Sequence, residues 1–108
     1  MIEPAWKRIG AIHLEADGTL GAVWLAHDYT SNVVYCYDAA VFRPEVPAII
    51  TEAIAARGRH IPLAWRKKDK ELADKLLDSG INVLPDHSSD DPGMIEMISR
   101  CLLYTSDA

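Results

Sequence analysis

The side chains best suited to metal chemistry lie close together near the first predicted turn. His13 and Glu15 are two residues apart in a predicted strand and therefore share a face, and Asp17 follows in the turn. An imidazole and two carboxylates at this spacing could form a metal site. Asp17 also suits the turn itself, and His13, predicted to lie opposite Ala22, could simply be hydrogen-bonded. The pattern is compatible with a metal site and with a purely structural role.

A second group of charged residues follows the apolar run 61–65. Asp69 could supply a catalytic carboxylate, as could Glu15, but Asp69 is also well placed to cap a helix that is predicted to begin there. Arg66, Lys67 and Lys68 could contact DNA phosphates, although such a charge run also suits a solvated surface. Asp69 and Glu15 are therefore candidate catalytic residues, and the three basic residues are candidate DNA contacts.

Other active-site patterns are missing from the sequence. It contains no Ser/His/Asp or Cys/His nucleophile arrangement, no Rossmann glycine fingerprint and no P-loop. Cys36 and Cys101 have neither CxxC nor Cys/His spacing, so we expect two buried thiols and neither a zinc site nor a disulfide framework. The polar loop 86–91 could hold a cation, but turn formation and helix capping explain its acidic residues more simply.

Size and charge restrict the possible functions. A chain of 108 residues with 49% hydrophobic and 25% charged residues is typical of one soluble globular domain. The net charge of −5 argues against a generally basic nucleic-acid-binding surface, so any DNA contact must be local. No apolar stretch approaches the roughly 20 residues of a membrane span, and no signal peptide is evident. We expect a cytoplasmic protein that makes no contact with membranes.

Three apolar runs, 8–15, 20–27 and 33–38, predict an antiparallel meander. Asp17-Gly18 separates the first two runs and predicts a two-residue hairpin turn of type I′, which requires positive φ at both residues. The middle run is apolar on both faces, with Leu20, Ala22, Trp24 and Ala26 on one and Val23 and Leu25 on the other. It is therefore predicted to be a central strand covered on both sides. Trp24 and Trp65 are predicted to lie in the core.

The second half of the sequence alternates helical and strand patterns. A helix is predicted to start at the prolines of 43–47 and to stop at Gly58, with its apolar residues at helical spacing. A strand is expected over 60–65, with Pro62 at its start or on an edge. A second helix follows Asp69 and stops at Gly80, and a strand spans 81–84. A third helix begins at Asp91-Pro92 and presents Met94, Ile95, Ile98, Cys101 and Leu102 on one stripe.

The predicted order is therefore βββαβαβα, an α/β fold with a mixed sheet and helices packed on it. Right-handed crossovers would place the last strands parallel to the first. This arrangement is ribonuclease-H-like.

With these elements in order, the sequence resembles the C-terminal nuclease domain of phage terminase large subunits, the motors that package viral DNA. The resemblance runs through most of residues 8–98. Its matching stretches are RIGAI (8–12), GAVWLAHD (21–28), VYCYD (34–38), AIAARG (53–58), IPLAW (61–65) and NVLP (82–85), with a weaker match at GMIEMI (93–98). The order and spacing of these stretches carry the resemblance, since each alone is also a plausible strand or helix end.

The resemblance implies a two-metal nuclease. In such enzymes carboxylates on adjacent strand ends hold Mg²⁺ or Mn²⁺, which activate a water and stabilise the leaving oxygen of the phosphodiester. It also implies double-stranded DNA as a partner, with the portal and the small terminase subunit as partners of the parent protein. The corresponding location is the cytoplasm of the host cell.

The chain departs from the family pattern at the acids that matter most. His13 stands where the family has an aspartate on the first strand, and the place of the second acid is occupied by the basic run 66–68, with only Asp69 nearby. The third acid belongs to a C-terminal segment, and the ATPase half precedes the nuclease; the sequence contains neither. These departures indicate a truncated or degenerate nuclease domain over residues 1–100 that cuts DNA weakly or not at all and that need not bind metal.

Two alternatives remain open. The chain could be a non-catalytic ribonuclease-H-like module for DNA contact or docking, or a stand-alone resolvase-like nuclease that uses Glu15 and Asp69. Residues 101–108 resemble translated sequencing-adapter read-through, so we expect a tail that is not native.

Overall fold

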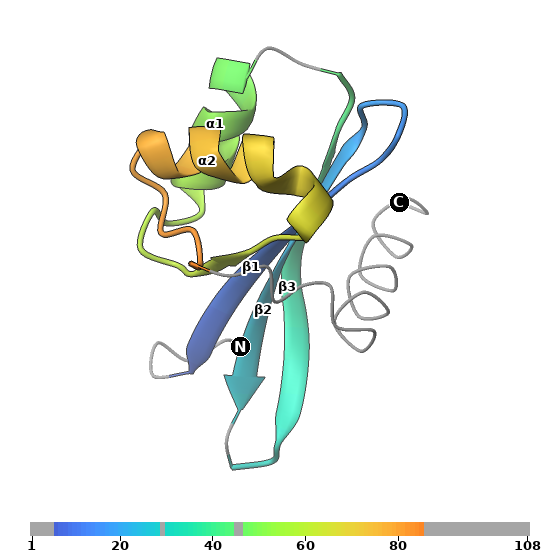
Figure 1. Ribbon diagram of the computed structural model, residues 1–108. Coiled ribbons are helices and arrows are strands. Elements are labelled where there is room, and N and C mark those ends of the chain that lie inside the picture. The colour runs from blue at the N-terminus through green and yellow to red at the C-terminus, as the bar shows by residue number, and fades with distance from the viewer. Residues whose placement is uncertain (1–5, 29, 45–46, 86–108) are drawn as a thin grey trace.

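The computed structural model describes residues 6–28, 30–44 and 47–85. Its sheet contains β1 (Lys7–Leu14), β2 (Leu20–Asp28), β3 (Val33–Phe42) and β4 (Leu63–Ala64), in the order β3-β2-β1-β4. The first three strands are antiparallel, and β4 is parallel to β1. The predicted mixed sheet and α/β class are therefore confirmed (Figure 1).

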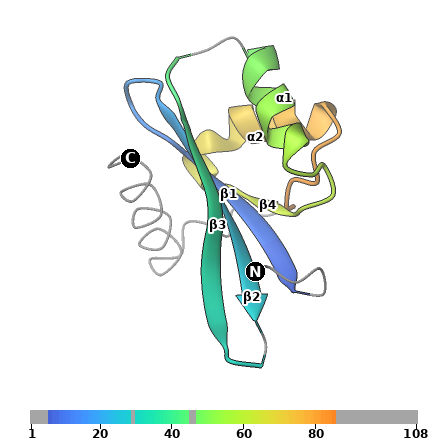
Figure 2. The ribbon, with the colours of Figure 1, turned by 180° about the vertical axis from the view of Figure 1, so that it is seen from behind.

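Two helices cover one face of this sheet. The helix α1 (Pro47–Ala56) connects β3 to β4, and α2 (Lys70–Asp78) follows β4 through a short 3₁₀ turn, η1 (Lys67–Asp69). Both helices end just before the predicted glycine stops. Figure 2 shows them gathered at one end of the sheet, while the β2–β3 hairpin extends well past them. Part of each predicted apolar stripe packs on the sheet, whereas Ile49 and Leu77, which the helical spacing also placed on the stripes, are exposed.

The core lies between these helices and the sheet. Side chains that point to this face of β2 include Leu20, Ala22 and Trp24, and they pack with Ile54 of α1 and Leu76 of α2. The opposite face of the sheet carries a second buried cluster of Ala11, Val23, Leu25 and Ala64. The central position of β2 and its burial on both faces are thus confirmed, as is the burial of Trp24 and Trp65.

The first hairpin differs from the two-residue turn that the sequence predicts. Gly18 has φ of 90°, but among the described residues other than glycine only Asn32 has positive φ, so Asp17 does not adopt the type I′ geometry. Gly18 N donates to Glu15 O at 3.0 Å, and Glu15 N donates to Thr19 O at 2.8 Å. A three-residue loop with glycine in the left-handed position results. It moves the register by one residue, so that His13 pairs with Gly21 and not with Ala22.

Other strand predictions need smaller corrections. The third strand continues to Phe42 because a β-bulge at Tyr37 lets the pairing with β2 resume at Asp38. Cys36 is exposed on this strand, which contradicts the expected buried thiol. The predicted fifth strand over 81–84 is reduced to a parallel bridge between Val83 and Leu63. The loop 86–91, the third helix, Cys101 and the tail 101–108 lie outside the described residues.

Candidate functional site

The candidate residues meet at one end of the β1–β4 pair. Because the two strands are parallel neighbours, their C-terminal ends lie at the same edge of the sheet. The end of β1 contributes His13, and Glu15 follows this strand. The segment after β4 contributes Arg66 and Asp69. Sequence positions more than fifty residues apart are thereby placed in direct contact.

Arg66 lies at the centre of this group. Its Nε donates to Asp69 Oδ2 at 3.0 Å, its Nη2 donates to Leu14 O at 2.6 Å, and its Nη1 lies 3.1 Å from His13 Nε2. Arg66 is 6% exposed and Asp69 is 3% exposed. A buried guanidinium is tolerable only when its fork of donors is matched by acceptors, as it is here.

Asp69 is at the predicted N-cap position of α2 but does not cap the helix through its side chain. Its Oδ2 instead accepts the hydrogen bond of Arg66 and lies 3.4 Å from Leu14 N. A bond between a carboxylate and a guanidinium joins two opposite charges, whereas a capping bond to a backbone N–H involves only one, so the carboxylate turns toward Arg66. Its side chain therefore connects η1 to β1.

His13 and Glu15 are in contact as the strand pattern predicted. Nε2 of His13 lies 2.7 Å from Glu15 Oε1, and Nδ1 of His13 is buried without a hydrogen-bond partner among the described residues. The contacts of Nε2 compete, because one nitrogen cannot donate to Glu15 and accept from Arg66 at once. Burial, and secondly the charge of Arg66, lower the pKa of His13 below its usual 6.5, against the opposite effect of Glu15. The neutral imidazole is therefore favoured near neutral pH.

Asp17 has a different role from the one that a metal site would require. Its Oδ1 accepts a hydrogen bond from Thr19 N at 2.9 Å, and its hydrogen bonds with Thr19 lower the pKa of the exposed carboxyl group. Asp17 thus stabilises the hairpin turn. Within residues 6–28, 30–44 and 47–85, no group of three or more His, Cys, Asp or Glu side chains is arranged to hold a metal ion.

The residues at this site do not fit the divalent cation that the family resemblance implies. The buried carboxylate of Asp69 is already bound to a guanidinium, and His13 also lies against that guanidinium. A metal ion placed between the side chains of Asp69 and His13 would be repelled by the positive charge of Arg66. The positive charge at these strand ends is supplied by an arginine.

The three predicted DNA contacts are separated by the fold. Arg66 is buried and directed inward, whereas Lys67 and Lys68 are exposed on η1. Arg66 is therefore not presented to a phosphate on the protein surface. Lys67 and Lys68 are accessible, and Lys70 beside them pairs with Asp74 at 2.9 Å.

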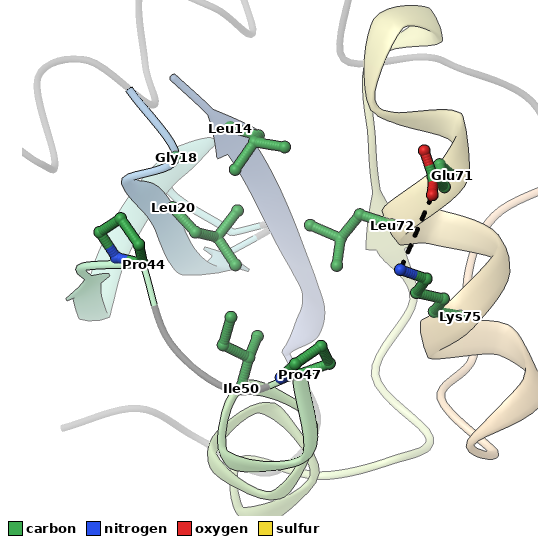
Figure 3. A pocket seen from close by; sticks show the side chains of 9 residues that line it. All are labelled: Leu14, Gly18, Leu20, Pro44, Pro47, Ile50, Glu71, Leu72 and Lys75. Atoms are coloured by element: carbon green, nitrogen blue, oxygen red, sulfur yellow. Dashed lines mark ion pairs between the residues drawn. The ribbon is translucent and has the colours of Figure 1, made fainter. Parts of the chain in front are cut away.

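An apolar pocket that no sequence pattern indicated lies beside the site. It has a volume of about 680 Å³, and Leu14 forms part of its wall. Figure 3 shows Leu14, Leu20 and Leu72 directed into the same space from β1, β2 and α2. The ion pair between Glu71 and Lys75, with 3.7 Å between Oε1 and Nζ, lies at its rim. In the sequence, the only signal related to this pocket is the pattern of apolar residues that are expected to be buried in the strands and helices.

No protein-family model matches the sequence, and no curated protein matches it. Among solved structures, the nuclease domain of the P22 large terminase superposes with a TM-score of 0.74 at 19% sequence identity. The superposition covers 94% of this chain and 60% of the other chain. The chain has the fold of a terminase nuclease domain.

The terminase-like fold confirms the architecture that the sequence predicted. The ribonuclease-H-like arrangement of the sheet is shown, and the chain spans about three fifths of the length of the P22 domain. At 19% identity the similarity concerns the fold and not the chemistry. No helix in the described part of the chain has the length and hydrophobicity that a membrane crossing needs.

Proposed function

We propose that residues 1–100 are part of a terminase-type nuclease domain whose metal position is replaced by an internal ion pair, so that this chain cuts DNA weakly or not at all. The parent activity would be Mg²⁺- or Mn²⁺-dependent endonucleolytic cleavage of viral DNA during packaging. The fold supports the relation to terminase nucleases, and the sequence stretches that resemble the family support it independently.

The observation that carries this proposal is the position of Arg66. Its guanidinium contacts Asp69, His13 and the carbonyl of Leu14, at the strand ends where such nucleases hold their metals. Two-metal cleavage needs several carboxylates facing the ions, because each ion must bind both protein and phosphate oxygens. Here Asp69 is neutralised by Arg66, and Glu15, which is 56% exposed, contacts His13.

The setting of the parent protein belongs to the same proposal. Double-stranded DNA would be its substrate, and the portal and the small terminase subunit would be its partners. It would work in the cytoplasm of the infected host cell. Each of these statements extends the family resemblance to this chain.

Nicking of supercoiled plasmid tests the proposal directly. The chain is incubated with plasmid and Mg²⁺ or Mn²⁺, with EDTA and Asp69→Ala as controls. We expect at most weak nicking above the level of the EDTA control, with no dependence on Asp69. Nicking that needs the metal and disappears in Asp69→Ala would show that the site is catalytic and would overturn the proposal.

A second candidate is a non-catalytic module that contacts duplex DNA. The two lysines Lys67 and Lys68 favour it, since both are exposed although they lie between the buried residues Arg66 and Asp69 in the sequence. Charge reversal at both positions should weaken duplex binding and flatten its salt dependence. Charge reversal at Lys75, which pairs with Glu71 on α2, is the matched control. Equal effects from both changes would point to general electrostatics and not to a specific contact.

A further inference from the structure

A second concentration of cationic and aromatic side chains lies at the opposite end of β1 from Asp69. Lys7 and Arg8 come from the start of β1, and Trp6 immediately precedes this strand. Arg57 and His60 come from the connection between α1 and β4. They line a hollow of about 470 Å³ together with Ile61 and Pro62. At about 3.3 Å per residue, the strand separates this hollow from Asp69 by roughly 20 Å.

Four aromatic rings lie toward this end of the sheet, and each is in contact with another ring or a guanidinium. The ring of Trp6 stacks on Tyr35, with centroids 5.4 Å apart and planes 10° apart. Arg8 Cζ lies 5.1 Å from the ring centroid of Tyr37. Further in, Arg57 Cζ lies 4.9 Å from the ring of Trp24. Two of the rings therefore lie against a guanidinium, and the other two stack on each other.

The strand register produces this alignment. Arg8 pairs with Ala26, and Ala26 pairs with Tyr35, so Arg8 and Tyr35 share a face of the sheet. The bulge in β3 inserts Tyr37 between the residues that pair with β2. Gly10 leaves room for Trp24, because a Cβ at Gly10 would lie 3.0 Å from Trp24 Nε1. The relative positions of these side chains thus follow from the strand pairing.

The charge of the hollow is opposite to that of the whole chain. Its described lining contains Lys7, Arg8, Arg57 and His60 and no acidic residue. Arg57 is held by Asp38 at 3.0 Å, whereas Lys7 and Arg8 form no ion pair within the described part of the chain. In a chain of net charge −5, a local excess of this kind favours an anionic ligand.

We propose that this hollow binds a segment of single-stranded nucleic acid, with a phosphate at its cationic lining and a base against Trp6. Exposed aromatic rings beside a cationic groove are the features that bind unpaired bases and their backbone. Bases within a duplex are already stacked and cannot use an aromatic ring in this way. A volume of about 470 Å³ lies in the range of small-ligand pockets. The proposal is independent of metal binding and of cleavage.

Fluorescence anisotropy with a short labelled oligothymidylate at low salt tests this proposal. Trp6→Ala should weaken binding by about 5-fold or more, because stacking of one base is lost, and Trp6→Phe should restore most of the affinity. Lys7→Ala should reduce the slope of log affinity against log salt by about 0.7. Lys70→Ala, at the start of α2 and close to the opposite end of β1, is the matched control and should leave the affinity unchanged.

A second measurement uses the unaltered protein. Trp24 and Trp65 are buried, so Trp6 should contribute most of the tryptophan emission that acrylamide quenches. The oligonucleotide should protect that emission. The proposal is overturned if no binding is detected, if Lys70→Ala weakens binding as much as Trp6→Ala does, or if thymidine monophosphate binds as tightly as the oligonucleotide. The last result would show a nucleotide pocket and not a site for a strand. Plasmid nicking is a separate readout, so either proposal can fail alone.

Discussion

At the scale of single residues, the buried ion pair of Arg66 and Asp69 contrasts with two exposed ion pairs on α2. Arg66 and Asp69 are almost fully buried, whereas Lys70–Asp74 and Glu71–Lys75 lie on the surface of α2. Removal of one partner from a buried pair leaves an unpaired charge in a medium of low polarity. Removal of one partner from an exposed pair leaves a charge that water can solvate.

We therefore expect Arg66→Ala to lower the free energy of unfolding by about 3–5 kcal/mol. Lys70→Ala should lower it by less than about 1 kcal/mol. Urea denaturation of both variants, followed by circular dichroism, measures the difference. Arg66→Lys should remain clearly destabilised, because an ammonium cannot reproduce the fork toward Asp69 and Leu14. Equal losses in the alanine variants would contradict a structural role for the buried pair.

The lowered pKa of His13 predicts a pH dependence of stability. In the unfolded chain this histidine titrates near 6.5, and in the folded chain it titrates at a lower pH because of burial and of Arg66. The unfolded state therefore binds more protons in the interval between the two values. Its contribution to stability is complete above pH 6.5 and is lost as the pH falls through the folded pKa.

Denaturation midpoints measured in the pH range below 7 test this prediction. The unaltered chain should lose stability from His13 as the pH falls, and His13→Asn should show a flatter profile in the same range. His60→Asn is the matched control, since His60 is exposed. A profile that His60→Asn flattens as strongly as His13→Asn does would argue against the assignment.

The sequence identified most residues of the site but not the direction of Arg66. A basic run such as 66–68 suggests one solvated surface, and no local pattern tells its members apart. The 3₁₀ turn decides the outcome, because residues three apart lie on the same side of it and Arg66 thereby meets Asp69. The contacts with β1 then depend on strand pairing across more than fifty residues, which a local pattern does not specify.

At the scale of elements, the helices are held by only part of each apolar stripe. Ile54 of α1 is 2% exposed, whereas Ile49 on the same helix is 50% exposed. Both were assigned from sequence to the buried stripe, because helical spacing alone gives a broad face. The sheet under α1 covers a narrower part of that face, so it determines which isoleucine is buried.

These two isoleucines allow a matched comparison within one helix. Ile54→Ala removes side-chain atoms packed among the residues of the main core and should cost about 2–5 kcal/mol. Ile49→Ala should cost less than about 1 kcal/mol, because its side chain is half exposed already. Thermal or urea unfolding gives both values. A loss at Ile49 as large as that at Ile54 would mean that another surface covers α1 in solution.

Strand order and strand register differed in how well the sequence specified them. The meander, the central strand and the parallel addition of β4 follow from apolar runs and crossover rules. The register of the first hairpin does not follow from them, because Asp-Gly is suited both to a two-residue turn and to a three-residue loop that ends in glycine. The observed loop pairs His13 with Gly21 while leaving Leu20 and Ala22 on the core face. The pattern of burial was thus predictable, and the pairing partner of His13 was not.

At the scale of the whole molecule, the two ends of β1 carry different electrostatic arrangements. One end has a buried ion pair with Lys67 and Lys68 outside it, and the other has the open cationic hollow beside Trp6. Both lie on an acidic chain of net charge −5. At the first end, Arg66 and Asp69 neutralise each other's charge. The stability of the chain should therefore not require any added ion.

The melting temperature of the unaltered chain should therefore be the same in Mn²⁺ and in EDTA. The double variant His13→Asp, Arg66→Ala places two carboxylates at the same strand ends without the guanidinium. It should be less stable than the unaltered chain in EDTA, because like charges are left close together.

Mn²⁺ should recover this loss, since an ion that binds only the folded state stabilises it by mass action. At a Mn²⁺ concentration about 100 times Kd, the melting temperature of the double variant should rise by about 10 °C or more. The single variant Arg66→Ala controls for loss of the ion pair alone and should respond less. If Mn²⁺ stabilises the unaltered chain as much as the double variant, then Arg66 does not replace the metal. If Mn²⁺ does not raise the melting temperature of the double variant, these strand ends no longer have the geometry of a metal site.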